Sequence, residues 1–174
     1  EIDLQNILYT AQLGLKNPIA IRYPRGRGVI KDWEEFHFGK YKKIEIGKAK
    51  LLKNGSKTAI LSTGAIGNNV TLALAKIRHP ENFAHYDFPF IKPLDEKELH
   101  TIFGKFETII TIEDGTIKGG FGSEILEFAA THNYTSKIKL LGIPDTFIDQ
   151  GSIDQLQQYC GISVDSLKIV FSSY

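Results

Sequence analysis

Thr108-Ile109-Ile110-Thr111-Ile112 is an unbroken run of β-branched residues, and the glycine-rich segment Gly119-Gly120-Phe121-Gly122-Ser123 follows it. β-branched side chains pack well on the pleated surface of a sheet, so the run predicts a strand. Residues 119–130 predict a helix that begins at glycines. A strand followed by a helix is the repeating unit of folds in which helices cover a parallel sheet.

The same alternation extends on both sides of this stretch. Asn54-Gly55 separates the first two predicted strands and is typical of a hairpin turn. Asp95, with Glu98 three residues later, predicts a capped helix start. Strands are expected at 48–52, 58–62, 83–87, 108–112 and 138–141, and helices at 65–78, after Pro93, and at 119–130, 153–159 and 164–170. We therefore expect an α/β fold, with a mostly parallel sheet, one antiparallel edge strand and helices on both faces.

The N-terminal part of the chain has a different pattern. Apolar residues recur with helical spacing over 1–14, and a short apolar run at 18–23 predicts a buried strand. Residues 29–46 have no clear period and predict a linker. The chain is therefore expected to divide into residues 1–28, a linker at 29–46 and a domain at 47–174.

The composition is that of an ordinary globular protein, with 174 residues, 42% hydrophobic and 24% charged. A formal charge of +1 gives no strong attraction to nucleic acid or a membrane surface. No apolar run approaches the ~20 residues of a membrane helix, and no signal peptide is visible. The single cysteine, Cys160, indicates a reducing compartment, and the absence of methionine predicts that the chain is part of a longer polypeptide.

The segment Ile21-Arg22-Tyr23-Pro24-Arg25-Gly26-Arg27-Gly28 places three arginines at the end of the predicted N-terminal strand. Arginine presents a planar fork of donors that suits phosphate or carboxylate, and glycine lets a backbone approach a ligand closely. The segment is therefore a candidate site for a small anion. A solvated basic turn is the alternative, and spacing alone favours it.

Three loops follow predicted strands at the edge of the sheet where α/β folds usually bind ligands. Thr63-Gly64-Ala65 is read as a tight turn into a helix, and Asp145 in Gly142-Ile143-Pro144-Asp145 as a helix cap. In the third loop, the glycines at 119–122 do not follow the strand directly, which argues against a dinucleotide site and favours close packing of the next helix.

The remaining candidate residues form no complete catalytic set. Glu113 and Asp114 are adjacent, so a strand would send them to opposite faces. Cys160 has no basic neighbour and predicts a buried structural thiol. The five histidines, at positions 37, 79, 85, 100 and 132, show no metal-ligand spacing. His100 and His132 are expected at the surface or at helix ends.

The order of the motifs closely resembles the C-terminal part of the 1-deoxy-D-xylulose-5-phosphate synthases, which are transketolase-like thiamine diphosphate enzymes. The most specific segments are Arg22-Tyr23-Pro24-Arg25-Gly26 and Leu141-Gly142-Ile143-Pro144-Asp145-Thr146-Phe147-Ile148. Others are Asn6-Ile7-Leu8-Tyr9-Thr10-Ala11, Phe90-Ile91-Lys92-Pro93-Leu94-Asp95, Ile112-Glu113-Asp114-Gly115 and Gly119-Gly120-Phe121-Gly122-Ser123. The resemblance covers nearly the whole chain.

This resemblance implies a transferase that joins pyruvate to D-glyceraldehyde 3-phosphate, releases CO2 and makes 1-deoxy-D-xylulose 5-phosphate. The product serves isoprenoid, thiamine and pyridoxal biosynthesis. The intact enzyme would be a homodimer and would require thiamine diphosphate and Mg2+. Neither cofactor is expected to bind this chain, because the family's cofactor-binding motifs are not found here. Residues 1–28 would then be the tail of the pyrimidine-binding domain and 47–174 the transketolase C-terminal-like domain.

By the resemblance, Arg25 binds the phosphate of glyceraldehyde 3-phosphate. Arg22 is given a structural role, and Arg27 is read as a solvated charge. Glu113 and Asp114 receive no role. The chain alone is expected to be inactive and to contribute this substrate contact and a dimer surface. The location implied is the bacterial cytoplasm, or a plastid for a plant-type source. The alternatives are a 2-oxo acid dehydrogenase β subunit, a transketolase, or a stand-alone α/β interaction module.

Overall fold

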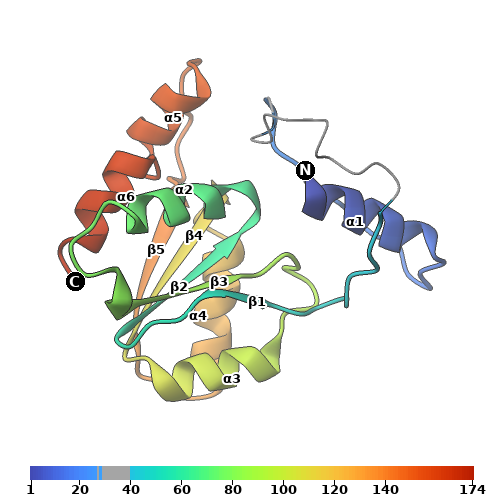
Figure 1. The fold of residues 1–174 in the computed structure, drawn as a ribbon, viewed down its shortest axis with the longest axis horizontal. Coiled ribbons are helices and arrows are strands. Elements are labelled where there is room, and N and C mark those ends of the chain that lie inside the picture. Colours follow the sequence, from blue (N-terminus) through green and yellow to red (C-terminus); the bar gives the residue numbers. More distant parts are fainter. Residues whose placement is uncertain (27, 29–39) are drawn as a thin grey trace. The chain divides into compact units, whose positions relative to one another are not determined.

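The computed structural model describes residues 1–26, 28 and 40–174, which form two compact units, 1–46 and 47–174 (Figure 1). Arg27, His37 and most of the predicted linker lie outside the described residues. None of the described helices is long and apolar enough to cross a membrane.

Unit 1–46 is built on one helix, α1 (Ile2–Gln12), as the helical spacing predicted. It stops before Gly14, whose φ of +89° suits glycine at a helix end. The Thr10 hydroxyl donates to the Asn6 carbonyl (2.7 Å) and accepts from the backbone N–H of Ile44 (2.9 Å). The segment around Ile44 is therefore hydrogen-bonded to α1 within this unit.

The predicted strand at 18–23 is wrong. These residues have no regular secondary structure, and most of their side chains are exposed, Tyr23 at 71%. A strand needs a neighbour to satisfy its N–H and C=O groups, and none of the described residues pairs with this segment as a strand. Apolar composition alone does not supply that partner.

Unit 47–174 contains a five-stranded sheet in the order β1-β3-β2-β4-β5 (Figure 1). All neighbours are parallel except β1 and β3, so the predicted fold class is confirmed. The strands are β1 (Lys50–Lys53), β2 (Thr58–Thr63), β3 (Phe83–Asp87), β4 (Thr108–Thr116) and β5 (Lys137–Ile143).

The predicted hairpin between β1 and β2 is wrong, because β1 pairs with β3. Both edges of β2 are occupied by parallel neighbours, Thr58 lying opposite Phe83 on one side and Thr108 on the other. Gly55 instead passes against β3, where a Cβ would lie 2.0 Å from the Phe83 carbonyl carbon. Gly55 thus allows the chain between β1 and β2 to pass close to the backbone of β3, and the Asn-Gly pair does not form a two-residue hairpin.

Helices cover both faces of the sheet (Figure 1). α3 (Glu96–Lys105) and α4 (Phe121–Thr131) bury Ile102 and Ile125 against one face. α2 (Gly67–Leu74) and α6 (Val164–Phe171) bury Val70 and Leu167 against the other. The remaining helical segments are the 3-10 turns Gly64–Ile66 and Pro80–Asn82 and the short helix α5 (Ile153–Tyr159).

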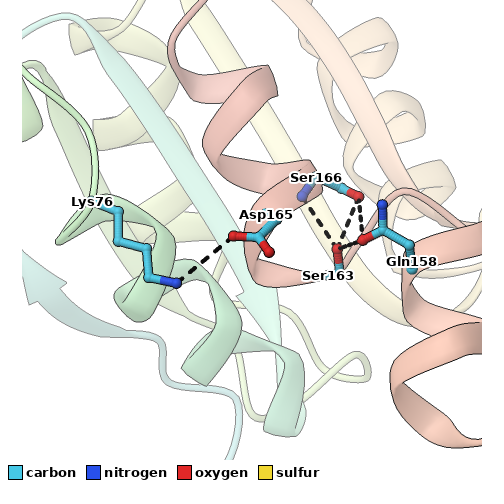
Figure 2. Close-up of polar contacts among 5 residues, drawn as sticks. All are labelled: Lys76, Gln158, Ser163, Asp165 and Ser166. Carbon is cyan, nitrogen blue, oxygen red and sulfur yellow. Dashed lines mark hydrogen bonds and ion pairs between the residues drawn. The ribbon is translucent and has the colours of Figure 1, made fainter.

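Polar caps fix where the helices begin. The Asp95 carboxylate accepts from the Glu98 N–H (3.2 Å), as predicted, and also from Ala49 N–H (3.1 Å). Figure 2 shows the corresponding contacts between α5 and α6, where the Ser163 hydroxyl caps α6 and donates to Gln158. These caps fix the first turns of α3 and α6.

Candidate functional site

The arginine segment lies in unit 1–46. Arg22 and Arg25 are both exposed, and Gly26 after them has a φ of +133°, a conformation that favours glycine. Because residues 18–23 form no strand, both arginines lie on an irregular segment. Arg27 lies outside the described residues. The Arg25 side chain is thus available to solvent and to any anion that approaches this segment.

In unit 47–174, the carboxyl ends of β2, β4 and β5 define the edge where ligands were expected. β2 ends at Thr63, and Gly64, with a φ of +77°, turns directly into the following 3-10 turn. The interpretation of this loop as a tight turn is confirmed. The Thr63 hydroxyl donates to the carbonyl of Phe88 (2.8 Å), which ties the turn to the end of β3.

β4 continues four residues further than predicted, so Glu113 and Asp114 lie within the strand. Their side chains point to opposite faces as expected, Glu113 being 5% exposed and Asp114 exposed. The Glu113 carboxylate accepts from the backbone N–H groups of Phe121 (3.0 Å to Oε2) and Gly122 (2.9 Å to Oε1). Sequence reasoning left Glu113 without a role, since nothing in its spacing reveals this contact eight and nine residues away.

The N-terminus of α4 is therefore already capped by an anionic side chain from β4. A helix N-terminus attracts anions through its free N–H groups and its dipole. Here two of those N–H groups donate to Glu113, whose charge also repels a second anion. This geometry agrees with the prediction that the glycines at 119–122 do not form a dinucleotide site.

The glycines instead allow close packing, as predicted. A Cβ on Gly120 would lie 2.2 Å from Glu113 Oε2. One on Gly122 would lie 2.7 Å from Thr111 Oγ1 and 2.9 Å from Leu140 Cδ2. α4 therefore approaches the sheet more closely than any residue with a side chain would permit.

Asp145 does not cap a helix, which corrects the prediction. Its carboxylate pairs with Lys118 (2.9 Å) on the surface, whereas α5 begins at Ile153 with Ser152 as its cap. Both charged groups are more than half exposed, so this pair contributes little to stability.

Two further groups have nucleophile or base chemistry. Cys160 is half-buried at the end of α5, and burial, followed by the charge of Asp114, raises the pKa of its thiol. A raised pKa leaves less of the reactive thiolate, which fits a structural role for Cys160.

His85 is 1% exposed, with Nε2 2.8 Å from the Ser62 hydroxyl, and burial lowers its pKa to about 4. This Ser–His pair is sealed in the core and has no path to a substrate.

His100 and His132 are at the surface, as predicted, but the fold also brings them together. Their ring centroids are 4.6 Å apart. They are 32 positions apart, which is no recognisable metal-ligand spacing, so nothing in the sequence indicated this contact. Across the described parts of the chain, no three His, Cys, Asp or Glu side chains gather in a group able to hold a metal ion.

Comparison with known proteins identifies the fold and the family of unit 47–174. Residues 47–167 match the family model described as transketolase, C-terminal domain. Two solved structures share the fold. "Split gene transketolase, inactive beta4 tetramer" has a TM-score of 0.68 at 20% identity, covering 76% of this chain and 43% of that one. Transketolase from Campylobacter jejuni has a TM-score of 0.54 at 19% identity, covering 74% and 19%.

The sequence relatives are more specific. The chain is 46% identical over 168 residues to the 1-deoxy-D-xylulose-5-phosphate synthase of Parabacteroides distasonis, and 47% identical over 169 residues to that of Bacteroides thetaiotaomicron. Each match covers 96% of this chain, which spans about a quarter of the relatives' length (26%). The resemblance predicted from the motif order is confirmed, and the chain belongs to the transketolase C-terminal domain family.

Proposed function

We propose that the polypeptide containing this chain is a 1-deoxy-D-xylulose-5-phosphate synthase. It would condense pyruvate with D-glyceraldehyde 3-phosphate, release CO2 and form 1-deoxy-D-xylulose 5-phosphate for isoprenoid, thiamine and pyridoxal biosynthesis. The observation that carries this proposal is the identity of 46–47% with enzymes of that name over 96% of the chain. The solved transketolases, at 19–20% identity, support only the fold.

Within that enzyme, Arg25 binds the phosphate of the acceptor aldehyde. Its guanidinium is exposed on a segment that Gly26 turns, so a phosphate can reach it from solvent. A bidentate, charge-assisted contact at the phosphate fixes the far end of the substrate. The binding energy gained there would orient the aldehyde carbonyl for carbon–carbon bond formation. Arg25 is thus a substrate-binding residue that takes no part in proton transfer.

Thiamine diphosphate, together with Mg2+, would supply the carbanion chemistry of the complete enzyme. The described residues do not fit either group, because they form no cluster of metal ligands and the α4 N-terminus is bound by Glu113. We place both in other parts of the polypeptide. Residues 1–28 would belong to its pyrimidine-binding domain and 47–174 to its C-terminal domain, and the chain alone would be inactive.

We further infer that the complete enzyme is a homodimer to which this chain contributes surface. It would act in the bacterial cytoplasm, or in a plastid if the source is plant-like. Light scattering on the purified complete polypeptide tests this part. A mass of two polypeptides supports it, and a mass of one contradicts it.

The activity is tested by incubating the complete polypeptide with pyruvate, D-glyceraldehyde 3-phosphate, thiamine diphosphate and Mg2+. We expect 1-deoxy-D-xylulose 5-phosphate by mass spectrometry, with one CO2 released per product. Omitting the diphosphate cofactor is the control and should abolish the product. A polypeptide that converts ketose phosphate donors but forms no product from pyruvate would be a transketolase, and the proposal would be wrong.

A further inference from the structure

The connection between β1 and β2 holds Asn54-Gly55, the pair that was expected to form a hairpin turn and does not. Asn54 is exposed, and Gly55 has no side chain to hinder an approach to its backbone nitrogen. Covalent geometry keeps that nitrogen within reach of the Asn54 side-chain carbon Cγ, because a bond between them closes a five-membered ring. The pair therefore carries an electrophile and a nucleophile side by side.

Neither reacting group is held by a protein partner. Among the described residues, none accepts a hydrogen bond from the Gly55 N–H or bonds to the Asn54 side-chain amide. Asn133 is equally exposed, but the N–H that follows it, that of Tyr134, donates to the Ala129 carbonyl (2.9 Å). An N–H held in this way must break its hydrogen bond before its nitrogen can attack.

A positive charge lies on the peptide group that joins Asn54 to Gly55. The Lys53 ammonium donates to the Asn54 carbonyl oxygen (3.0 Å). It is held there by the carbonyl oxygens of Pro80 (2.5 Å) and Phe83 (3.0 Å). When the Gly55 nitrogen loses its proton, the negative charge spreads through the peptide group onto the Asn54 oxygen. A hydrogen bond from a cation stabilises that charged form, so Lys53 favours the state of Gly55 that attacks.

We propose that Asn54 undergoes spontaneous deamidation and that Lys53 promotes it. The Gly55 nitrogen bonds to Asn54 Cγ, the Cγ–Nδ2 bond breaks, and the side-chain amide leaves as ammonia with the proton from Gly55. Water then opens the ring. Cleavage between the nitrogen and Cγ leaves an aspartate at position 54, and cleavage of the main-chain bond leaves an isoaspartate. The reaction consumes only water, so it is independent of the enzyme activity proposed above.

The packing of Gly55 gives the modification a structural consequence. A Cβ on Gly55 would lie 2.0 Å from the carbonyl carbon of Phe83, so a residue with a side chain does not fit there. An isoaspartate adds one carbon to the main chain at this close approach to β3. It also places a new carboxylate beside the Lys53 ammonium, which bonds to three carbonyl oxygens in this region.

Incubation of the folded complete polypeptide at pH 8.5, followed by peptide mapping with mass spectrometry, tests the site. The peptide containing position 54 should gain the mass of replacing NH by O and should separate into aspartate and isoaspartate forms. Asn133 should react at least about tenfold more slowly, because its neighbouring N–H is bonded. Asn54→Gln is the matched variant. It keeps an amide but would need a six-membered ring, so position 54 should stay unmodified.

The role of Lys53 is tested separately. Lys53→Met should slow the reaction at Asn54 about tenfold in the folded polypeptide. Lys57→Met is the control, because Lys57 is an exposed lysine close by in the sequence, and it should leave the rate unchanged. In concentrated urea the contact is lost, so Lys53→Met and the unsubstituted polypeptide should react at similar rates.

Three results would each overturn the proposal. The first is an intact Asn54 in the folded polypeptide under conditions that deamidate it in urea, since the fold would then protect the site. The second is a folded Lys53→Met variant that reacts at least as fast as the unsubstituted polypeptide. The third is a difference between these two that persists in urea, which would assign the effect to local sequence and not to the folded contact.

Discussion

The Glu113 carboxylate oxygen Oε1 accepts a hydrogen bond from the backbone N–H of Gly122 at 2.9 Å, joining β4 to the first turn of α4. The second oxygen accepts from Phe121, so one buried side chain satisfies two N–H groups that the helix itself leaves unpaired. The negative charge also lies at the positive end of the helix dipole. This contact fixes the depth at which α4 packs on the sheet.

Glu113→Gln should lower the free energy of unfolding by about 1–3 kcal/mol. The amide keeps one acceptor oxygen, but its NH2 group faces an N–H donor and the favourable charge is lost. Urea unfolding followed by far-UV circular dichroism measures the change. Asp114→Asn is the matched control, because Asp114 is the exposed neighbour on the same strand. Equal stability in the two variants would contradict the capping role.

Gly122→Ala and Gly104→Ala should change stability in opposite directions. The new methyl at 122 would meet Thr111 Oγ1 at 2.7 Å and Leu140 Cδ2 at 2.9 Å, and such overpacking costs about 1–3 kcal/mol. At Gly104, within α3, a Cβ meets nothing within 4 Å, so alanine should stabilise the helix by about 0.5–1 kcal/mol. Thermal unfolding of both variants checks the signs. A stabilised Gly122→Ala would show that α4 does not need this close approach.

Thr111→Val should be neutral or stabilising. Thr111 is 1% exposed, and its buried hydroxyl has no hydrogen-bond partner among the described residues. Valine has the same shape and removes a buried polar group that gains nothing from folding. Thr63→Val is the counterpart, because the Thr63 hydroxyl donates to Phe88 O at 2.8 Å and its loss should cost about 1 kcal/mol. Urea midpoints that fall equally for both would reject the distinction.

His85 should make the chain less stable in mild acid. Burial lowers its pKa in the folded state to about 4 from an ordinary 6.5, so the unfolded chain binds the proton more readily. The stability that neutral His85 contributes is therefore complete above pH 6.5 and is lost as the pH falls toward 4. Between these values it adds a slope of up to about 1.4 kcal/mol per pH unit.

His85→Gln should remove that slope, since glutamine can still bond to Ser62 but does not titrate. Urea unfolding at pH 7, 6 and 5 measures it. His79→Gln is the control, because His79 is a histidine whose side chain is 60% exposed. A pH dependence that is the same in His85→Gln and the unmodified chain would mean that His85 is not the buried titrating group.

The alternation of strands and helices was predictable because each element in unit 47–174 has a strong local pattern. The β-branched residues of β4 and the Asp95 cap of α3 are examples. Pairing was less predictable, since nothing local to Asn54-Gly55 shows that both edges of β2 are taken by other strands. An apolar run such as 18–23 predicts burial only if a partner strand exists.

In the candidate site, too, local features were predictable from the sequence and contacts between distant residues were not. Arg25 is proposed as a substrate-binding residue from its motif, which is contiguous in the sequence. Glu113 with Gly122, and His100 with His132, are contacts between residues 9 and 32 positions apart. Such contacts depend on how deeply α4 packs and where it ends, and these features emerge only from the folded sheet.

Arg25→Ala in the complete polypeptide tests the proposed substrate contact, because the contact is to the phosphate of the acceptor and not to its aldehyde. Steady-state kinetics should compare D-glyceraldehyde 3-phosphate with unphosphorylated D-glyceraldehyde at saturating pyruvate. Arg78→Ala, another exposed arginine, is the control. We predict a roughly 10- to 100-fold fall in kcat/KM for the phosphorylated acceptor, with an unchanged KM for pyruvate and little change for D-glyceraldehyde. Equal losses for both acceptors, or none for either, would contradict the account.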